Sequence, residues 1–266
     1  MLRLGDVGGM HGSQMGVPRV VQRRTCLLTL LAAGCDRPAR RAPPEPTPAT
    51  PTRAPYSALR ARIGALQDEH RERYVAAEEA QKRAVLADAR SELQSALADV
   101  LLPAWLGTRW AFHGTADEPL DPRGIACGYF VATVLQHVGL HLESRRRFAQ
   151  STARTIARSL VPAGASHHRV FSVPATVLEE RVRSFGDGVH LIGLDVHVGF
   201  LVVARGAVRV VHASYLGSRT VVNEPITACE AIERSRDAGY HVTTLFAADT
   251  LVDAWLTRWT IPLRTA

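Results

Sequence analysis

The feature that most constrains the fold is the apolar stretch 188–217, which reads GVHLIGLDVHVGFLVVARGAVRVVHASYLG. Valine dominates it, together with leucine and isoleucine, and β-branched residues favour strands. Arg205 and Gly206 lie between two apolar runs and fit a two-residue hairpin turn. We therefore expect an antiparallel hairpin and a β-rich second half of the chain.

This turn decides which side chains of the hairpin share a face. His212 is expected opposite Gly199, and His197 is expected opposite Ser214. Because side chains alternate along a strand, His197 and His212 then project from one face as diagonal neighbours. A register slip of one residue would place them on opposite faces. The turn thus predicts two adjacent imidazoles.

A lone cysteine lies where a loop changes into an apolar helix, in the stretch GIACGYFVATVL at 124–135. Its apolar positions recur at helical spacing and Gly139 follows as a terminator, so we expect Cys127 in the first turn of this helix. Free N–H groups and the helix dipole favour a thiolate there. Three interpretations stay open: a nucleophile, half of a disulfide with Cys229, or an inert buried residue.

The stretches GTRWAFHGT, IACGYFV and DVHVGFLVVARGAVRVVHAS together resemble the NlpC/P60 superfamily of cysteine peptidases, over about residues 106–216. That family has a Gly-Thr-x-aromatic stretch, an Asp-Cys-Ser-Gly-Phe helix start, a His-Val-Gly strand and a strand ending in His-Ala-Ser. The resemblance implies a papain-like α+β domain in which Cys127 is the nucleophile and His197 the general base. It also implies that His212 orients the base and that Trp110 contacts the substrate.

The chain departs from the family pattern beside the cysteine. Ala126 and Gly128 stand where the family has Asp and Ser, which help to hold the free amine of the substrate. We expect a thiol amidohydrolase or peptidase that acts on cell-wall peptide or a related amide. The alternatives are a catalytically inactive envelope binding protein of the same fold and a thiol acyltransferase.

Residues 1–34 have the layout of a signal peptide, with a basic segment followed by a short apolar run, and Met15 is an alternative start. The sequence LAAGC resembles the lipobox of bacterial lipoproteins, which makes Cys35 the expected lipidation site. Proline recurs without apolar periodicity over 35–55, which is typical of an extended linker. We expect a lipoprotein anchored to the membrane on the periplasmic or extracytoplasmic side of the cell envelope.

Residues 56–102 are rich in Ala, Glu and Arg, lack proline and predict one long helix or a helical hairpin ending near Pro103. Their apolar stripe is thin, so they must pack on the domain that follows or on a partner. Residues 103–266 are expected to form the catalytic domain. A further strand at TVVNEPI and a short helix over 251–258 complete an α+β pattern.

The net charge of +7 raises the question of a nucleic-acid partner. Lys82 is the only lysine, and no stripe of basic and aromatic residues of the kind that binds single strands is present. We therefore predict no nucleic-acid partner. Neither an HExxH nor a paired CxxC spacing occurs in the sequence, so no metal or other cofactor is predicted.

Overall fold

The computed structural model describes residues 55–162, 164, 166–170 and 172–264. The predicted signal peptide, the predicted lipidation site Cys35 and nearly all of the predicted linker lie outside the described residues. Among the described residues, no helix is both long enough and apolar enough to cross a membrane.

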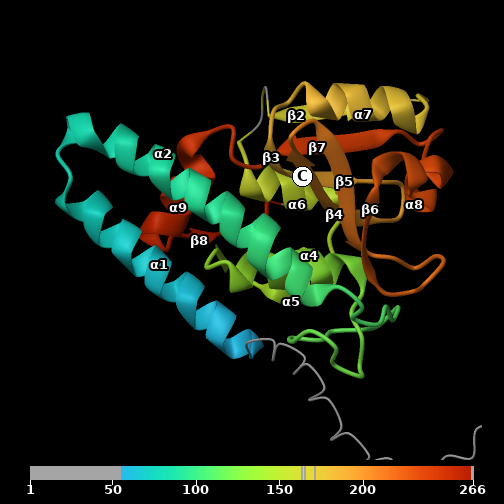
Figure 1. Ribbon diagram of the computed structural model, residues 1–266, viewed down its shortest axis with the longest axis horizontal. Coiled ribbons are helices and arrows are strands. Elements are labelled where there is room, and N and C mark those ends of the chain that lie inside the picture. Colours follow the sequence, from blue (N-terminus) through green and yellow to red (C-terminus); the bar gives the residue numbers. More distant parts are fainter. Residues whose placement is uncertain (1–54, 163, 165, 171, 265–266) are drawn as a thin grey trace, which may run out of the picture. The chain divides into compact units, whose positions relative to one another are not determined.

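The chain from residue 56 begins with a helical hairpin (Figure 1), so the second of the two expected forms is the correct one. Helix α1 spans Tyr56–Ala76 and helix α2 spans Glu79–Ser95. The helices are separated because Glu78 starts α2 with a capping box, in which its side chain and that of Gln81 each bond to the other's backbone N–H.

The helical segment ends at Trp105, close to the end expected near Pro103. After α2 the chain continues through a π-helical segment, Ala96–Leu101, into the short helix α3, Leu102–Trp105. Pro103 lies in the first turn of α3, where the missing N–H of proline does no harm.

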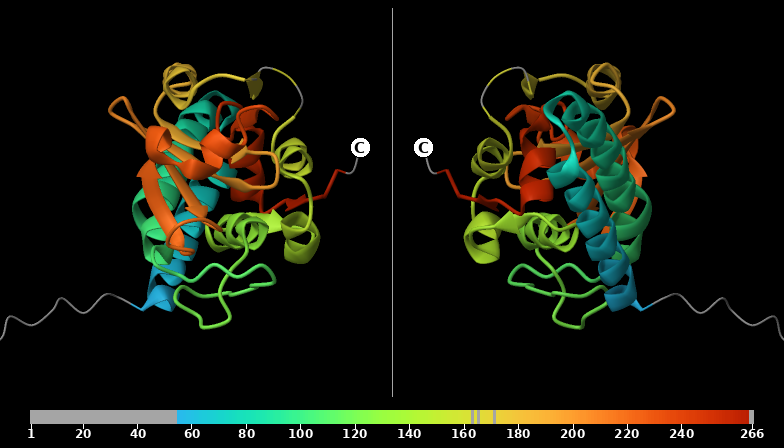
Figure 2. Two further views of the ribbon diagram at one scale, coloured as in Figure 1. Left: turned by 90° about the vertical axis from the view of Figure 1, so that its right-hand side faces the viewer. Right: turned by 90° about the vertical axis from the view of Figure 1, so that its left-hand side faces the viewer.

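The hairpin packs on the part of the chain that follows it, as Figure 2 illustrates from two sides. Leu93 and Trp105 are fully buried in the same core as Trp255 near the C-terminus. Trp105 donates a hydrogen bond from Nε1 to the Tyr56 hydroxyl (2.8 Å), and that hydroxyl also bonds to Nδ1 of His137 (2.9 Å). The thin stripe is thus buried by the domain that follows it.

The second half of the chain contains a six-stranded antiparallel sheet, with the strand order β2-β7-β3-β4-β5-β6. Its strands are β2 (His167–Val170), β3 (Gly188–Gly193), β4 (Val198–Ala204), β5 (Ala207–Ala213), β6 (Val221–Pro225) and β7 (Tyr240–Thr244). The strands β1 (His141–Leu142) and β8 (Thr260–Ile261) form a separate parallel pair. The expected α+β class, with helices before an antiparallel sheet, is confirmed.

The predicted hairpin turn and its register are confirmed between β4 and β5. Arg205 and Gly206 both have positive φ, 51° and 77°, which is the geometry of a type I′ turn. Phe200 pairs with Val211 near the far end of the ladder, which is the register that this turn requires.

Helices cover both faces of the sheet. Alternate strand residues such as Leu191 and Phe200 join the core beneath α4 (Cys127–His137), α5 (Arg145–Ala149), α6 (Ala153–Leu160) and α9 (Asp249–Thr257). Their neighbours Ile192 and Leu201 join a second core beneath α7 (Ala175–Arg183) and α8 (Glu230–Arg234). The α4 helix ends at His137, and Gly139 follows the cap residue Val138 with a φ of 101°, which suits glycine.

Candidate active site

Cys127 is the first residue of α4, as expected from the sequence. Ala126 caps the helix in an extended conformation, with φ −83° and ψ 157°. The next residue lets α4 approach α5 closely, because a Cβ on Gly128 would lie 2.0 Å from the carbonyl oxygen of Ala149. The absence of a side chain at Gly128 is therefore a packing requirement of this fold.

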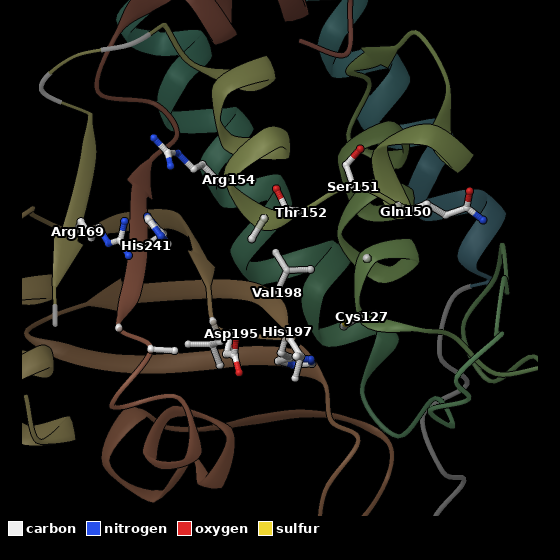
Figure 3. A pocket seen from close by; sticks show the side chains of 17 residues that line it. Cys127, Gln150, Ser151, Thr152, Arg154, Arg169, Asp195, His197, Val198 and His241 are labelled. Carbon is white, nitrogen blue, oxygen red and sulfur yellow. The ribbon is translucent and has the colours of Figure 1, made fainter. Parts of the chain in front are cut away.

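Cys127 and His197 line one cavity of about 610 Å³ (Figure 3). They come from different elements, since Cys127 begins α4 and His197 immediately precedes β4. The backbone N–H of Val198 hydrogen-bonds to the Cys127 sulfur, so the thiol lies against the start of β4. The fold thus brings the predicted nucleophile and base to one site.

The two predicted histidines form a direct pair. His197 Nε2 lies 2.7 Å from His212 Nδ1, and the ring planes are inclined by 78°. Both side chains are buried. Gly199 makes room for the pair, because a Cβ on it would lie 2.8 Å from the Cβ of His212. The expected face and register of these residues are therefore confirmed.

A third member of this chain of hydrogen bonds, Glu224, was not anticipated. His212 Nε2 lies 3.0 Å from Oε1 of Glu224, whose pKa is lowered chiefly by that hydrogen bond. The signal was present in TVVNEPI: β6 pairs with β5 so that Val222 faces His212, which makes Glu224 the diagonal neighbour of that histidine. A carboxylate thus ends the chain at its outer side.

The carboxylate determines where the protons lie in a neutral pair of imidazoles. Because Glu224 only accepts when ionised, Nε2 of His212 must carry a proton and Nδ1 of His212 must accept. His197 Nε2 then donates to His212, which leaves a lone pair on His197 Nδ1. This Nδ1 atom is buried and has no hydrogen-bond partner among the described residues. His197 therefore offers a free proton acceptor.

Burial decides the protonation of Cys127 and His197. It lowers the pKa of His197 to about 3, with a further decrease from His212, so His197 is neutral near pH 7. It also raises the pKa of the Cys127 thiol, and this increase outweighs the opposing effect of the N–H groups of Val198 and Gly128. The expected stabilisation of a thiolate by the helix start is present but is not dominant, so the resting pair is neutral.

Trp110 is not among the residues that line the cavity of Cys127 and His197. Its ring lies 6.3 Å from that of Tyr215, and the guanidinium of Arg219 lies 4.9 Å from its centroid. Tyr215 is the aromatic residue beside the base, with its ring centroid 5.3 Å from that of His197. The predicted contact of Trp110 with substrate stays a prediction.

Cys127 and Cys229 are both free thiols, so they do not form a disulfide. Cys229 is buried behind the histidine pair, with Sγ 3.7 Å from Nε2 of His212. Ligand atoms of His212, Glu224 and Cys229 lie within 4.8 Å of one another, close enough to hold a metal ion. Hydrogen bonds already join these atoms, because Glu224 accepts from both His212 and Cys229. The cluster therefore satisfies its polar atoms with protein groups.

Comparisons with family models, with curated proteins and with solved structures gave no match to this chain.

Proposed function

We propose that this protein is a thiol amidohydrolase or peptidase with a papain-like domain of the NlpC/P60 kind. The observation that carries the proposal is the chain of hydrogen bonds from Glu224 through His212 to His197. It ends at a buried Nδ1 that has no hydrogen-bond partner among the described residues. Cys127 at the start of α4 lines the same cavity as that base. A nucleophile, a base and residues that orient the base are the parts that covalent acyl transfer needs.

The first half of the reaction forms an acyl-enzyme. His197 Nδ1 takes the thiol proton while Sγ of Cys127 bonds to the carbonyl carbon, and the π electrons move to the oxygen. The backbone N–H of Cys127, at the start of the helix, donates to this oxyanion. When the intermediate collapses, the C–N bond breaks and the amine leaves with the proton from His197.

The second half releases the acid. Water gives a proton to His197 Nδ1 as its oxygen bonds to the acyl carbon, and the S–C bond then breaks. The departing sulfur recovers the proton, so Cys127 and His197 return to the neutral pair. In both halves His197 becomes an imidazolium transiently. It donates a hydrogen bond to His212, and His212 donates to the Glu224 carboxylate. This chain of hydrogen bonds stabilises the imidazolium.

The proposed setting is the bacterial cell envelope, with cell-wall peptide or a related amide as the substrate and Cys35 as the site of lipid attachment. The signal-like segment, the lipobox-like LAAGC and the proline-rich linker support this setting. Such a tether would hold the domain away from the membrane surface while keeping it close to the wall.

Alkylation by iodoacetamide tests the chemistry without knowledge of the substrate. Iodoacetamide should modify Cys127 at least tenfold faster in the wild type than in His197→Ala, because His197 Nδ1 takes the thiol proton as the sulfur attacks. Peptide mapping identifies the modified residue, and Cys127→Ala gives the background. Reaction of Cys127 at or below the rate of an ordinary thiol, unchanged in His197→Ala, would contradict the proposal.

One observation favours a second candidate, a non-catalytic binding protein of the same fold. Burial raises the pKa of Cys127, so the thiol is not held as a thiolate in the resting site. A binding protein would bind a wall fragment equally well in the wild type and in Cys127→Ala, and it would release no product. Product analysis by mass spectrometry therefore separates the two candidates.

A further inference from the structure

A second cavity of about 240 Å³ adjoins the cavity of Cys127. The two share three lining residues, Arg154, Arg169 and His241. Among the described residues that line the second cavity, none is acidic, whereas three are arginines and three are histidines: Arg154, Arg158, Arg169, His167, His168 and His241. The space beside the active site is therefore lined with cationic and titratable nitrogen groups.

Two separate elements supply these groups. Arg154 and Arg158 are four residues apart on α6, so they lie on one side of that helix. Arg169 on β2 pairs directly with His241 on β7, and α6 packs on this part of the sheet. The two arginines of α6 carry like charges, which repel each other at this spacing. The fold thus concentrates positive charge at the junction of the two cavities.

The pKa of His241 responds to this accumulation of positive charge. Its pKa is lowered by burial and then by the charges of Arg169 and Arg154. Arg154 is exposed and forms no ion pair within the described part of the chain. An anion placed between these groups would relieve the repulsion and gain charge-assisted hydrogen bonds.

The cavity of Cys127 is also polarised along its length. Figure 3 shows Arg154, Arg169 and His241 gathered at one end, while Asp195 lies beside His197. An anionic group would be repelled beside Asp195 and attracted at the arginine end. A substrate with one anionic group would therefore bind in a single direction.

We propose that Arg154, Arg158, Arg169 and His241 form an oxyanion-binding subsite, which takes a carboxylate or phosphate of the substrate while its amide carbonyl lies at Cys127. This inference rests on the proposed function and deepens it, because it names the substrate class as anionic amides. Guanidinium groups suit both oxyanions, which they bind through paired N–H donors.

A set of alkylating reagents tests the subsite. Each is a chloroacetamide that loses chloride as Cys127 Sγ bonds to its methylene carbon, and each carries an alkyl spacer of graded length ending in a carboxylate, a phosphonate or a neutral carboxamide. We expect the best anionic reagent to modify Cys127 about fivefold or more faster than the carboxamide of equal length. The better of the two anions identifies which oxyanion the subsite takes.

Variants identify the residues that produce the preference for anionic over neutral reagents. Arg154→Gln combined with Arg169→Gln should bring the ratio of anionic to neutral rates close to one. Arg146→Gln removes an exposed arginine from α5 that lines neither cavity, so this matched control should keep the wild-type ratio. Equal rates for anionic and neutral reagents in the wild type, with both reacting rapidly, would overturn the subsite and leave the proposed function intact.

Slow reaction of Cys127 with every reagent would overturn the proposed function but would leave the subsite to be tested separately. A binding measurement supplies that test. Glutarate and inorganic phosphate are titrated into the wild type, and the ring protons of His241 are followed by NMR across pH. A bound anion should raise the pKa of His241, and the double variant should lose most of that response. No response of His241 to either anion in the wild type would overturn the subsite.

Discussion

Replacing Glu224 by glutamine is the sharpest perturbation of the site, because it keeps the shape of the side chain and removes its charge. A glutamine can present either its carbonyl oxygen or its amide group to Nε2 of His212. The proton positions in His212 and His197 are then no longer determined by an obligatory acceptor. We therefore expect Glu224→Gln to slow the alkylation of Cys127 by iodoacetamide without touching Cys127 itself.

The size of this effect follows from the position of the carboxylate. A hydrogen bond to a charged group contributes about 1.5–3 kcal/mol. The Glu224 side chain is 31% exposed while that of His212 is 1% exposed, so solvent screens the outer partner and favours the lower end of this range. About 1.4 kcal/mol corresponds to a tenfold change in rate, and we expect a decrease of roughly tenfold.

The assay is pseudo-first-order alkylation near pH 7, followed by intact-mass spectrometry. Glu230→Gln is the matched control, because Glu230 is exposed and pairs with Arg234 on α8. It should keep the wild-type rate. Urea unfolding of both variants checks that the fold is retained. A rate for Glu224→Gln equal to that of the wild type, in a folded protein, would refute the positioning role of this carboxylate.

Three further predictions concern stability. In the folded protein the pKa of His197 is about 3, below its ordinary value of 6.5. The contribution of His197 to the free energy of unfolding is therefore complete above pH 6.5 and is lost as the pH falls toward 3. The free energy of unfolding should therefore drop by about 2 kcal/mol between pH 8 and pH 5 through this residue, and urea titrations of His197→Gln should show a smaller drop. Gly128→Ala should destabilise by about 1–3 kcal/mol, because its new Cβ would lie 2.0 Å from a carbonyl oxygen of α5. Gly64→Ala, in open space on α1, should instead stabilise by about 0.5–1 kcal/mol, and equal shifts in melting temperature for the two would contradict the packing argument.

The centre of the site was predictable because it depends on local rules. A two-residue turn at Arg205 and Gly206 sets the register of β4 and β5, and alternation then places His197 and His212 on one face. The position of Cys127 followed from the helical spacing of apolar residues and the terminator Gly139. These inferences need only the neighbouring residues in sequence.

Features that depend on distant pairing were missed. The strands β2 and β7 have polar or mixed sequences, HHRV and YHVTT, and they become strands because they pair with each other and with β3. The role of Glu224 requires the ladder between β5 and β6. The raised pKa of Cys127 depends on burial by the whole fold, which no local motif reports.

The hydroxyl of Tyr56 links the first described helix to the helix that bears Cys127. Tyr56 is the first residue of α1, and it bonds to Trp105 in the core and to His137 at the end of α4. Cys127 begins that same helix. Tension applied to the chain before residue 55 would enter this helix at Tyr56 and pass through one hydrogen bond to the helix that bears Cys127. A tether at this point would therefore load the helix of the candidate site rather than a remote surface loop.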